Sequence, residues 1–345
     1  MEGDKLTTTY SMWNTFRNCR RQCQHRYVDK LRPLGAKAES LQTGDLVHRC
    51  LEKWYRTNDA VLVQELIDSE LFGMTDEFGA MDAAKCRWQV TTAMMSAYTS
   101  YYPTEDFQVM ELELPFTSEI YNPATGAVSR SFTIAGKVDG VIQTPDGIFI
   151  LEHKTASRID AGYIDRLSSD MQVQLYSHFV EQAYGWKITG VLYNILGKPA
   201  STMKQKGGET DAEFAERIAT AKAPGRCKQQ MAETEQEFME RLLDWYQESP
   251  QERFHRETLY FTPRDIEDLR SELWELTQQY LSAQRSEDRR GFYKNSSQCY
   301  NYNRACDYVT ICRAANPDAI INAFYTRGND MHPELSTTNT SDELF

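Results

Sequence analysis

The stretch GKVDGVIQTPDGIFILEHK, residues 136–154, limits the possible folds of this chain more than any other part of its sequence. Two strand-like segments, 131–142 and 148–155, flank a short connection. That connection, Thr144–Gly147, has proline in its second position and glycine in its fourth, which is typical of a β-turn. We therefore predict a β-hairpin that turns at Pro145–Asp146.

Two carboxylates and one amine fall on one face of this hairpin. In the predicted register Asp139 faces Glu152, with Cβ atoms roughly 5 Å apart, and like charges at that distance are destabilising unless something neutralises them. Lys154 is two residues beyond Glu152 and points to the same face. Because the surrounding side chains are apolar, we expect a divalent cation at this position. The hairpin alone also allows a buried Glu152–Lys154 pair beside a surface Asp139.

Composition excludes several classes of protein. The chain has 345 residues, 41% of them hydrophobic and 12% aromatic, which suffices for one large domain or two modest ones. It contains no apolar run of about 18 residues and no signal-peptide pattern, so we expect a cytoplasmic protein with no membrane partner. The net charge of −12 argues against nucleic acid as a partner. Basic regions at 16–37 and 289–313 are still compatible with phosphate binding, or with a solvated helix face.

The order of the predicted elements gives the fold class. Helical patterns cover 7–31, 41–55, 60–70, 78–101, 163–184, 211–248 and 263–285, and strand patterns cover 109–116, 131–142, 148–155, 190–196 and 256–262. Helices followed by a three-strand meander, a helix and a strand predict an α/β fold with a small mixed sheet flanked by helices.

We expect one domain over residues 1–325. Its parts are a helical region at about 40–105, a core around the hairpin at about 106–200, and a helical and cysteine-containing segment at about 210–315. Residues 326–345 are polar and are predicted to form a flexible tail.

Three cysteines, Cys299, Cys306 and Cys312, lie within 14 residues near the C-terminus. Disulfides are rare in the cytosol, so this grouping indicates metal or cluster ligation rather than cross-linking. A fourth thiolate would complete a four-thiolate site, and Cys19 and Cys23 in the basic N-terminal segment are the candidates. Zinc and a [4Fe–4S] cluster both accept four thiolates, and the spacing does not separate them. Ordinary buried cysteines are the remaining alternative.

Five motifs, in order, resemble the RecB-like branch of the PD-(D/E)XK nucleases over about residues 10–315. SMWNTFRNCRRQCQHRYVDKL is similar to the family's opening and puts Cys19 at a cluster-ligand position, although Arg20 replaces the usual proline. Cys23 stands where an aromatic residue is usual, and we leave it out of the cluster. TGDLVHRCLEKW resembles the family's G-x-x-x-H helix and gives His48.

The remaining motifs extend the resemblance to the C-terminal cysteines. GKVDG gives Asp139, LEHK gives Glu152 and Lys154, and DMQVQLY matches a Q-x-x-x-Y motif at Gln172 and Tyr176. The cysteines resemble the closing ligands of the iron–sulfur members, which include CRISPR-associated adaptation nucleases, AddB nuclease domains and phage exonucleases. Their first gap, six intervening residues, is wider than the AddB-like gap and closer to that of some phage enzymes.

This resemblance implies a restriction-endonuclease-like core and metal-dependent hydrolysis of DNA phosphodiesters. It implies a Mg²⁺ or Mn²⁺ site made of His48, Asp139, Glu152 and the main-chain carbonyl of His153, and a catalytic set of Asp139, Glu152, Lys154, Gln172 and Tyr176. It also implies a [4Fe–4S] cluster on Cys19, Cys299, Cys306 and Cys312, with zinc as the less favoured occupant.

The expected function is that of a DNA exonuclease in recombination, replication or repair, encoded by a cell or by a phage. Its partners would be DNA with single-stranded ends and recombination or replication proteins, in the cytoplasm or, for a phage enzyme, the host cytoplasm. A CRISPR-type adaptation nuclease that trims DNA ends is a variant of this function. A non-catalytic DNA-binding scaffold subunit is the alternative of another class, and the intact Asp139, Glu152 and Lys154 argue against it.

Overall fold

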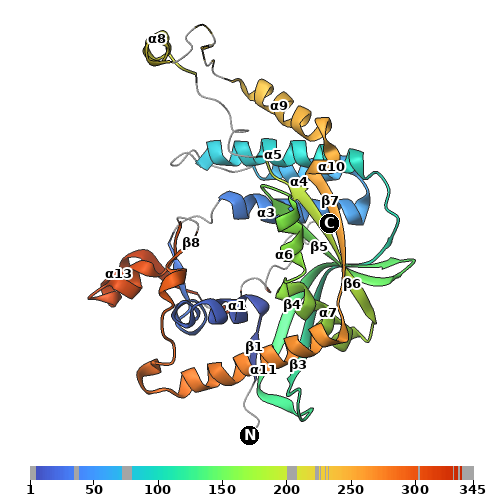
Figure 1. The fold of residues 1–345 in the computed structure, drawn as a ribbon, viewed down its shortest axis with the longest axis vertical. Helices are drawn as coiled ribbons and strands as arrows, with labels where there is room; N and C mark the ends of the chain where they lie inside the picture. Colours follow the sequence, from blue (N-terminus) through green and yellow to red (C-terminus); the bar gives the residue numbers. More distant parts are fainter. Residues whose placement is uncertain are drawn as a thin grey trace.

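A six-stranded mixed sheet forms the centre of the computed structural model (Figure 1). Three long strands, β3 (Gln108–Tyr121), β4 (Val128–Thr144) and β5 (Gly147–Ala156), form an antiparallel meander. On one side β6 (Ile188–Gly197) is parallel to β5, and β7 (Phe254–Tyr260) is antiparallel to β6. The short β1 (Leu6–Thr8) is parallel to β4.

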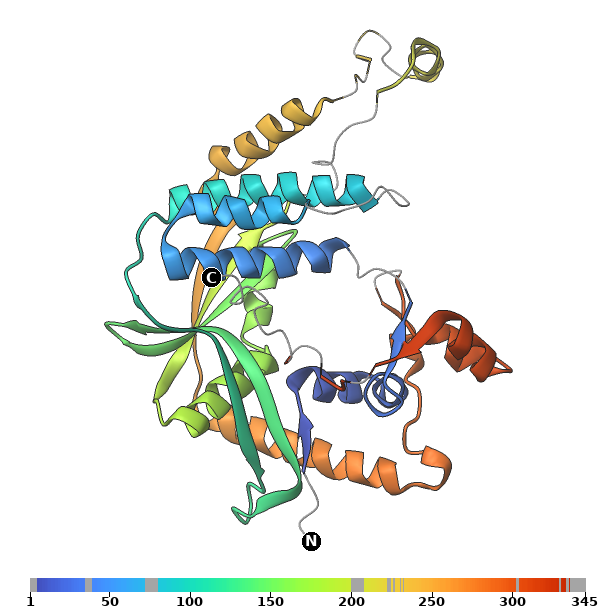
Figure 2. The same ribbon diagram turned by 180° about the vertical axis from the view of Figure 1, so that it is seen from behind.

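The structure describes residues 5–34, 39–71, 80–199, 208–221, 225, 227–229, 231, 233–301, 304–328, 330–332 and 335. Helices lie on both sides of the sheet (Figures 1 and 2), which confirms the predicted α/β fold with a small mixed sheet. Apart from short 3₁₀ turns, the helices of the described residues are α1 (Tyr10–Asn18), α2 (Arg20–Cys23), a π-helix (Gln24–Val28), α3 (Glu39–Thr57), α4 (Ala60–Ser69), α5 (Ala80–Tyr101), α6 (Ala161–Leu167), α7 (Met171–Tyr184), α8 (Asp211–Thr220), α9 (Glu235–Glu248), α10 (Pro250–Arg253), α11 (Pro263–Arg285), α12 (Val309–Arg313) and α13 (Pro317–Phe324). Within these residues, none of the helices combines the length and the apolar character needed to cross a membrane.

The two faces of the sheet pack against different helices. Ile150 and Val191 face the main core, where α1, α7 and α11 lie, whereas Leu151 and Leu192 pack with Tyr55 of α3. Successive strand residues point to opposite faces. On β5, even-numbered residues therefore point toward α7, and odd-numbered residues point toward α3.

The β4–β5 hairpin has the predicted register, and the two strands then separate. Thr144 pairs with Gly147 around the turn, and the ladder runs to the pair formed by Gly140 and Leu151. From there β5 continues along β6 to Ala156, while β1 pairs with β4. The strands thus form a fork that opens next to the predicted Asp139–Glu152 pair.

Two predicted helices are interrupted in the structure. The expected helix over 7–31 begins as β1, and extended backbone at Cys19 (φ −155°, ψ 106°) separates α1 from α2. The expected helix over 163–184 consists of α6 and α7, because Asp170 starts a new helix as N-cap and accepts a hydrogen bond from the Gln172 N–H. Periodicity continues across such caps, so it does not reveal them.

The N-terminal and C-terminal segments bind each other. Strand β2 (Leu31–Pro33) pairs antiparallel with β10 (Tyr325–Arg327), so the ordered structure extends past residue 325. His332 is buried, and its Nε2 lies 2.9 Å from the Thr7 carbonyl oxygen. The rest of the expected tail, apart from residues 328, 330–331 and 335, lies outside the described residues.

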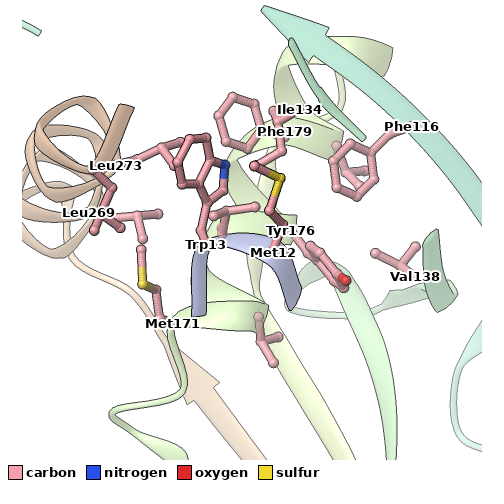
Figure 3. Close-up of a cluster of buried hydrophobic side chains, with 14 of the residues drawn as sticks. Met12, Trp13, Phe116, Ile134, Val138, Met171, Tyr176, Phe179, Leu269 and Leu273 are labelled. Atoms are coloured by element: carbon pink, nitrogen blue, oxygen red, sulfur yellow. The ribbon is translucent and has the colours of Figure 1, made fainter. Parts of the chain in front are cut away.

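Trp13 of α1 joins the N-terminal segment to the main core (Figure 3). Its ring packs edge-on against Phe132 at 5.6 Å and Tyr280 at 5.8 Å, and its Nε1 donates to Thr8 Oγ1 at 3.0 Å. Leu269 and Leu273 of α11 line the same cluster.

We expect Trp13→Ala to lower the free energy of unfolding by about 3–5 kcal/mol, because it leaves a cavity and removes apolar contacts. Chemical denaturation followed by circular dichroism would measure this loss. Val61→Ala, at an exposed position of α4, is the control and should change stability little. A Trp13→Ala protein as stable as the wild type would show that α1 contributes little to the core.

Candidate active site

Asp139 links three elements at the fork. Its Oδ2 accepts a hydrogen bond from the main-chain N–H of His153 on β5 at 2.8 Å. Its Oδ1 lies 3.2 Å from Nδ1 of His48, which α3 carries. The structure therefore brings His48, Asp139 and His153 together.

Charge couples His48 and Asp139 strongly. Burial alone would lower the pKa of His48, but the neighbouring Asp139 carboxylate raises it to about 9. Burial alone would raise the pKa of Asp139, but the His48 imidazolium and the His153 N–H hold it well below its ordinary value. Both pKa shifts favour a protonated His48 beside an ionised Asp139.

Glu152 and Lys154 lie on the α7 side of β5. Glu152 is 4% exposed, and its Oε1 accepts from the Lys154 ammonium at 2.7 Å. Burial raises the pKa of Glu152 to about 7; the Asp139 carboxylate raises it and Lys154 lowers it. The site therefore holds one carboxylate, that of Glu152, whose negative charge is poorly stabilised.

A second carboxylate, which the sequence analysis did not single out, holds Lys154. Asp170 Oδ2 lies 3.5 Å from Lys154 Nζ, while Oδ1 of the same side chain caps α7. Burial alone would lower the pKa of Lys154, but Glu152 and Asp170 raise it, so the ammonium stays protonated. Asp170 is the first residue of the DMQVQLY motif, and its N-cap position before an apolar run was the available signal.

Gln172 and Tyr176 lie one turn apart on α7, near Glu152. Tyr176 is buried and packs edge-on against Phe116 at 5.3 Å. Burial and the Glu152 carboxylate raise the pKa of the Tyr176 hydroxyl, which is hydrogen-bonded to Gln172. Both residues thus border the site, and Tyr176 also belongs to the core.

Tyr10 and Tyr163 also border Lys154, and sequence reasoning missed both. Burial and the Asp170 carboxylate raise the pKa of the Tyr10 phenol; burial also raises that of Tyr163, while Lys154 lowers both. Tyr10 begins α1 directly after β1, so the pairing of β1 with β4 brings the N-terminal segment to the site. No local sequence signal predicts this long-range pairing.

The side chain of His153 points to the opposite side of β5, toward α3. Its ring stacks on Tyr55 with centroids 5.6 Å apart and planes at 10°, and it meets His48 edge-on at 5.9 Å. Its Nδ1 lies 3.0 Å from Nδ2 of Asn194 on β6. Burial lowers the pKa of His153 to about 3, so the imidazole is neutral.

The four predicted cluster cysteines gather between the N-terminal and C-terminal segments. Burial raises the pKa of the Cys306 thiol, and Cys19 and Cys312 raise it further. Burial likewise raises the pKa of Cys312, with Cys19 and Cys299 adding to the shift. All four thiols are free, and the Asn295 N–H donates to Cys19 Sγ at 3.3 Å.

Cys23, which the sequence analysis excluded from this group, lies in the main hydrophobic core. It is fully buried, and its thiol donates to the Met12 carbonyl at 3.9 Å. A histidine instead contacts the group: His25 Nε2 lies 3.7 Å from Cys312 Sγ.

Several arginines of the basic regions bind the protein itself. Arg21 Nε donates to the Phe292 carbonyl at 2.6 Å, and Arg32 donates to the Met331 carbonyl at 3.3 Å. Arg289 pairs with Asp29 at 3.2 Å. These arginines therefore hold the N-terminal segment to the C-terminal segment through hydrogen bonds and an ion pair.

The fork residues fit a divalent cation in the kind of donor that they offer. The buried carboxylate of Glu152, the partly buried carboxylate of Asp139 and the imidazole of His48 converge there, a donor set that suits Mg²⁺ or Mn²⁺. Across the described part of the chain, no three His, Cys, Asp or Glu side chains are arranged as a ready metal-ion site. At the fork, His48 and Lys154 contact the Asp139 and Glu152 carboxylate oxygens that a cation would bind.

Comparison with known proteins agrees with this arrangement. A family model described as the PD-(D/E)XK nuclease superfamily matches residues 7–313. The matched range includes the fork, the helix that carries His48, and all four gathered cysteines. A search of curated proteins found no match.

Proposed function

The chain belongs to the PD-(D/E)XK nuclease superfamily, and we propose that it is a RecB-like exonuclease that acts on DNA in recombination, replication or repair. Family membership supports a metal-dependent nuclease. The observation that carries the proposal is the fork, where two separating strands hold Asp139, Glu152 and Lys154 beside the helix of His48.

In the proposed mechanism His48, Asp139, Glu152 and the main-chain carbonyl of His153 would hold Mg²⁺ or Mn²⁺. A bound divalent cation lowers the pKa of a water ligand and polarises the scissile phosphate. Asp139 is fixed for this role by the His153 N–H. Glu152 contributes a buried carboxylate whose negative charge a cation would stabilise.

Lys154 supplies positive charge next to the reacting phosphate. Glu152 at 2.7 Å and Asp170 at 3.5 Å orient its ammonium and keep it protonated. An ammonium held in a water-poor site stabilises the negative charge that develops on phosphate oxygens in the transition state. Gln172 and Tyr176 would complete the wall of the site on α7 and position Lys154 or the DNA backbone.

We expect Glu152→Gln and Lys154→Met to reduce DNA cleavage at least about 100-fold, because each removes a charge that acts in the transition state. Release of acid-soluble nucleotides with Mg²⁺ or Mn²⁺ would measure the loss, and circular dichroism would show that the fold persists. Glu119→Gln is the matched control, since that carboxylate pairs with Lys5 away from the fork. Variants that cleave at the wild-type rate would reject the assignment and favour the scaffold function.

End-dependent degradation separates an exonuclease from an endonuclease. We expect end-labelled linear DNA to release label with Mg²⁺ or Mn²⁺, while closed circular DNA of the same sequence stays intact, because an exonuclease needs a free end. Labelling the 5′ or the 3′ end gives the polarity, and EDTA serves as the negative control. Nicking or linearisation of the circle at a comparable rate would contradict the exonuclease assignment.

For the cysteines we propose a [4Fe–4S] cluster held by Cys19, Cys299, Cys306 and Cys312. The four thiols are free and gather between the N-terminal and C-terminal segments, which supports a shared site. Four cysteine thiolates are the usual ligand set of such a cluster, and zinc, which also accepts four thiolates, is the less favoured occupant. The cluster would join the N-terminal helices to the C-terminal segment and would be structural first.

We expect Cys306→Ala to lose the brown colour and the iron of the wild type and to melt at a lower temperature, because three thiolates hold the cluster poorly. Visible absorbance, iron and sulfide analysis and thermal denaturation on anaerobically purified protein would test this. Cys227→Ala, outside the group, should keep its iron. A colourless wild type with stoichiometric zinc would reject the iron–sulfur assignment.

A further inference from the structure

We propose that the side chain of His153 is a positioning residue for the metal site: it locks α3, which carries His48, onto β5, which carries Glu152 and Lys154. The inference rests on the proposed function and adds a role for the imidazole ring. The proposed mechanism uses only the main chain of His153.

The His153 ring lies between two residues of the same helix. Tyr55 stacks on one face with planes 10° apart, and His48 meets the ring edge-on. His48 and Tyr55 are about two turns apart on α3, so they share one helix face. A ring held against both residues fixes the rotation of α3 and its position along β5, and therefore the direction in which His48 points.

Asn194 fixes the rotation of the His153 imidazole ring. This residue is fully buried on β6, and its Nδ2 lies 3.0 Å from His153 Nδ1 and 2.9 Å from the Tyr98 hydroxyl. A hydrogen bond at Nδ1 resists rotation of the imidazole about its Cβ–Cγ bond. Phenylalanine could fill the same space but would lack this bond.

A rigid polar network supports Tyr55 and Asn194 from behind. The Tyr55 and Tyr98 hydroxyls are 2.8 Å apart, which links α3 to α5. Arg256 of β7 binds Glu105 through both terminal nitrogens, at 2.6 and 2.7 Å, and Glu105 accepts from the Tyr55 hydroxyl at 3.1 Å. Four elements and one connecting segment therefore hold the His153 ring at one angle.

One residue thus positions two proposed metal ligands. The His153 N–H sets the Asp139 carboxylate at 2.8 Å, and the His153 ring sets the His48 imidazole. Groups that orient metal ligands from behind typically change metal affinity or activity 10–100-fold when they are removed. We expect the ring of His153 to act in this way, through the affinity for the cation.

The test measures Mn²⁺ affinity without DNA, by calorimetry on anaerobically purified full-length protein, and then the Mn²⁺ dependence of cleavage. His153→Phe keeps the stacked ring and removes the bond to Asn194, and Asn194→Leu removes the same bond from the other side. Each variant should bind Mn²⁺ about 10-fold more weakly. The half-saturating Mn²⁺ concentration for cleavage should rise by the same factor. For Asn194→Leu, which lies outside the proposed metal site, the rate at saturating Mn²⁺ should stay near that of the wild type.

Two further variants serve as references. His48→Ala identifies the heat signal of the fork site, because it removes a proposed ligand. His178→Ala removes another largely buried ring, which packs on Phe179 of α7 at 4.9 Å, and it should lower the melting temperature without changing Mn²⁺ affinity.

The outcomes separate this inference from the function on which it rests. If the wild type binds Mn²⁺ and cleaves DNA while His153→Phe and Asn194→Leu bind Mn²⁺ equally well, the positioning role is wrong and the nuclease assignment stands. The same conclusion follows if the two variants lose only melting temperature, as His178→Ala does. A wild type that neither binds Mn²⁺ nor cleaves DNA overturns both.

Discussion

The partly buried charge of Asp139 is the constraint on which the site depends. Asp139 lies where β4 and β5 separate, and it meets a main-chain N–H of β5 and the imidazole of His48. A carboxylate in such a place is stable only with a full set of partners. Its neighbours accordingly come from one strand, β5, and one helix, α3, and the separation of β4 from β5 leaves room for them. The Asp139 charge therefore requires partners, and the separation of β4 and β5 provides the space in which they lie.

The second organising feature is the packing of the N-terminal segment against the C-terminal segment. Strand β2 pairs with β10, Tyr308 donates to the Leu31 carbonyl at 2.9 Å, and a small apolar core forms between them. Cys306 packs against this core, and Cys312 contacts His25 of the N-terminal segment. The N-terminal segment also brings Tyr10 close to Lys154. In this fold the proposed cluster and the proposed active site are linked by one short stretch of chain, β1 and α1.

Much of this arrangement could be predicted from the sequence, because its signals are local. The turn chemistry of Thr144–Gly147 fixed the hairpin register, and the pattern over residues 263–285 gave α11 to the residue. Contacts across long sequence separations were not predictable. Asp170 and Tyr10 reach Lys154 through strand pairing and helix capping, and the His153 ring finds Tyr55 and Asn194 only once α3 packs on the sheet. Periodicity identifies a buried face but does not identify the partner on that face.

The placement of β1 also has a consequence for how the chain avoids self-association. Because β5 leaves β4 at the fork, part of the edge of β4 would otherwise present free main-chain donors and acceptors, and such edges invite pairing with other molecules. Leu6–Thr8 pairs with Phe132–Ile134, and the Thr8 hydroxyl donates to the Thr133 carbonyl at 2.7 Å. Three residues thus cover an edge that the opening of the site exposes. The same short strand that brings a tyrosine to the site also guards the sheet against intermolecular β-pairing.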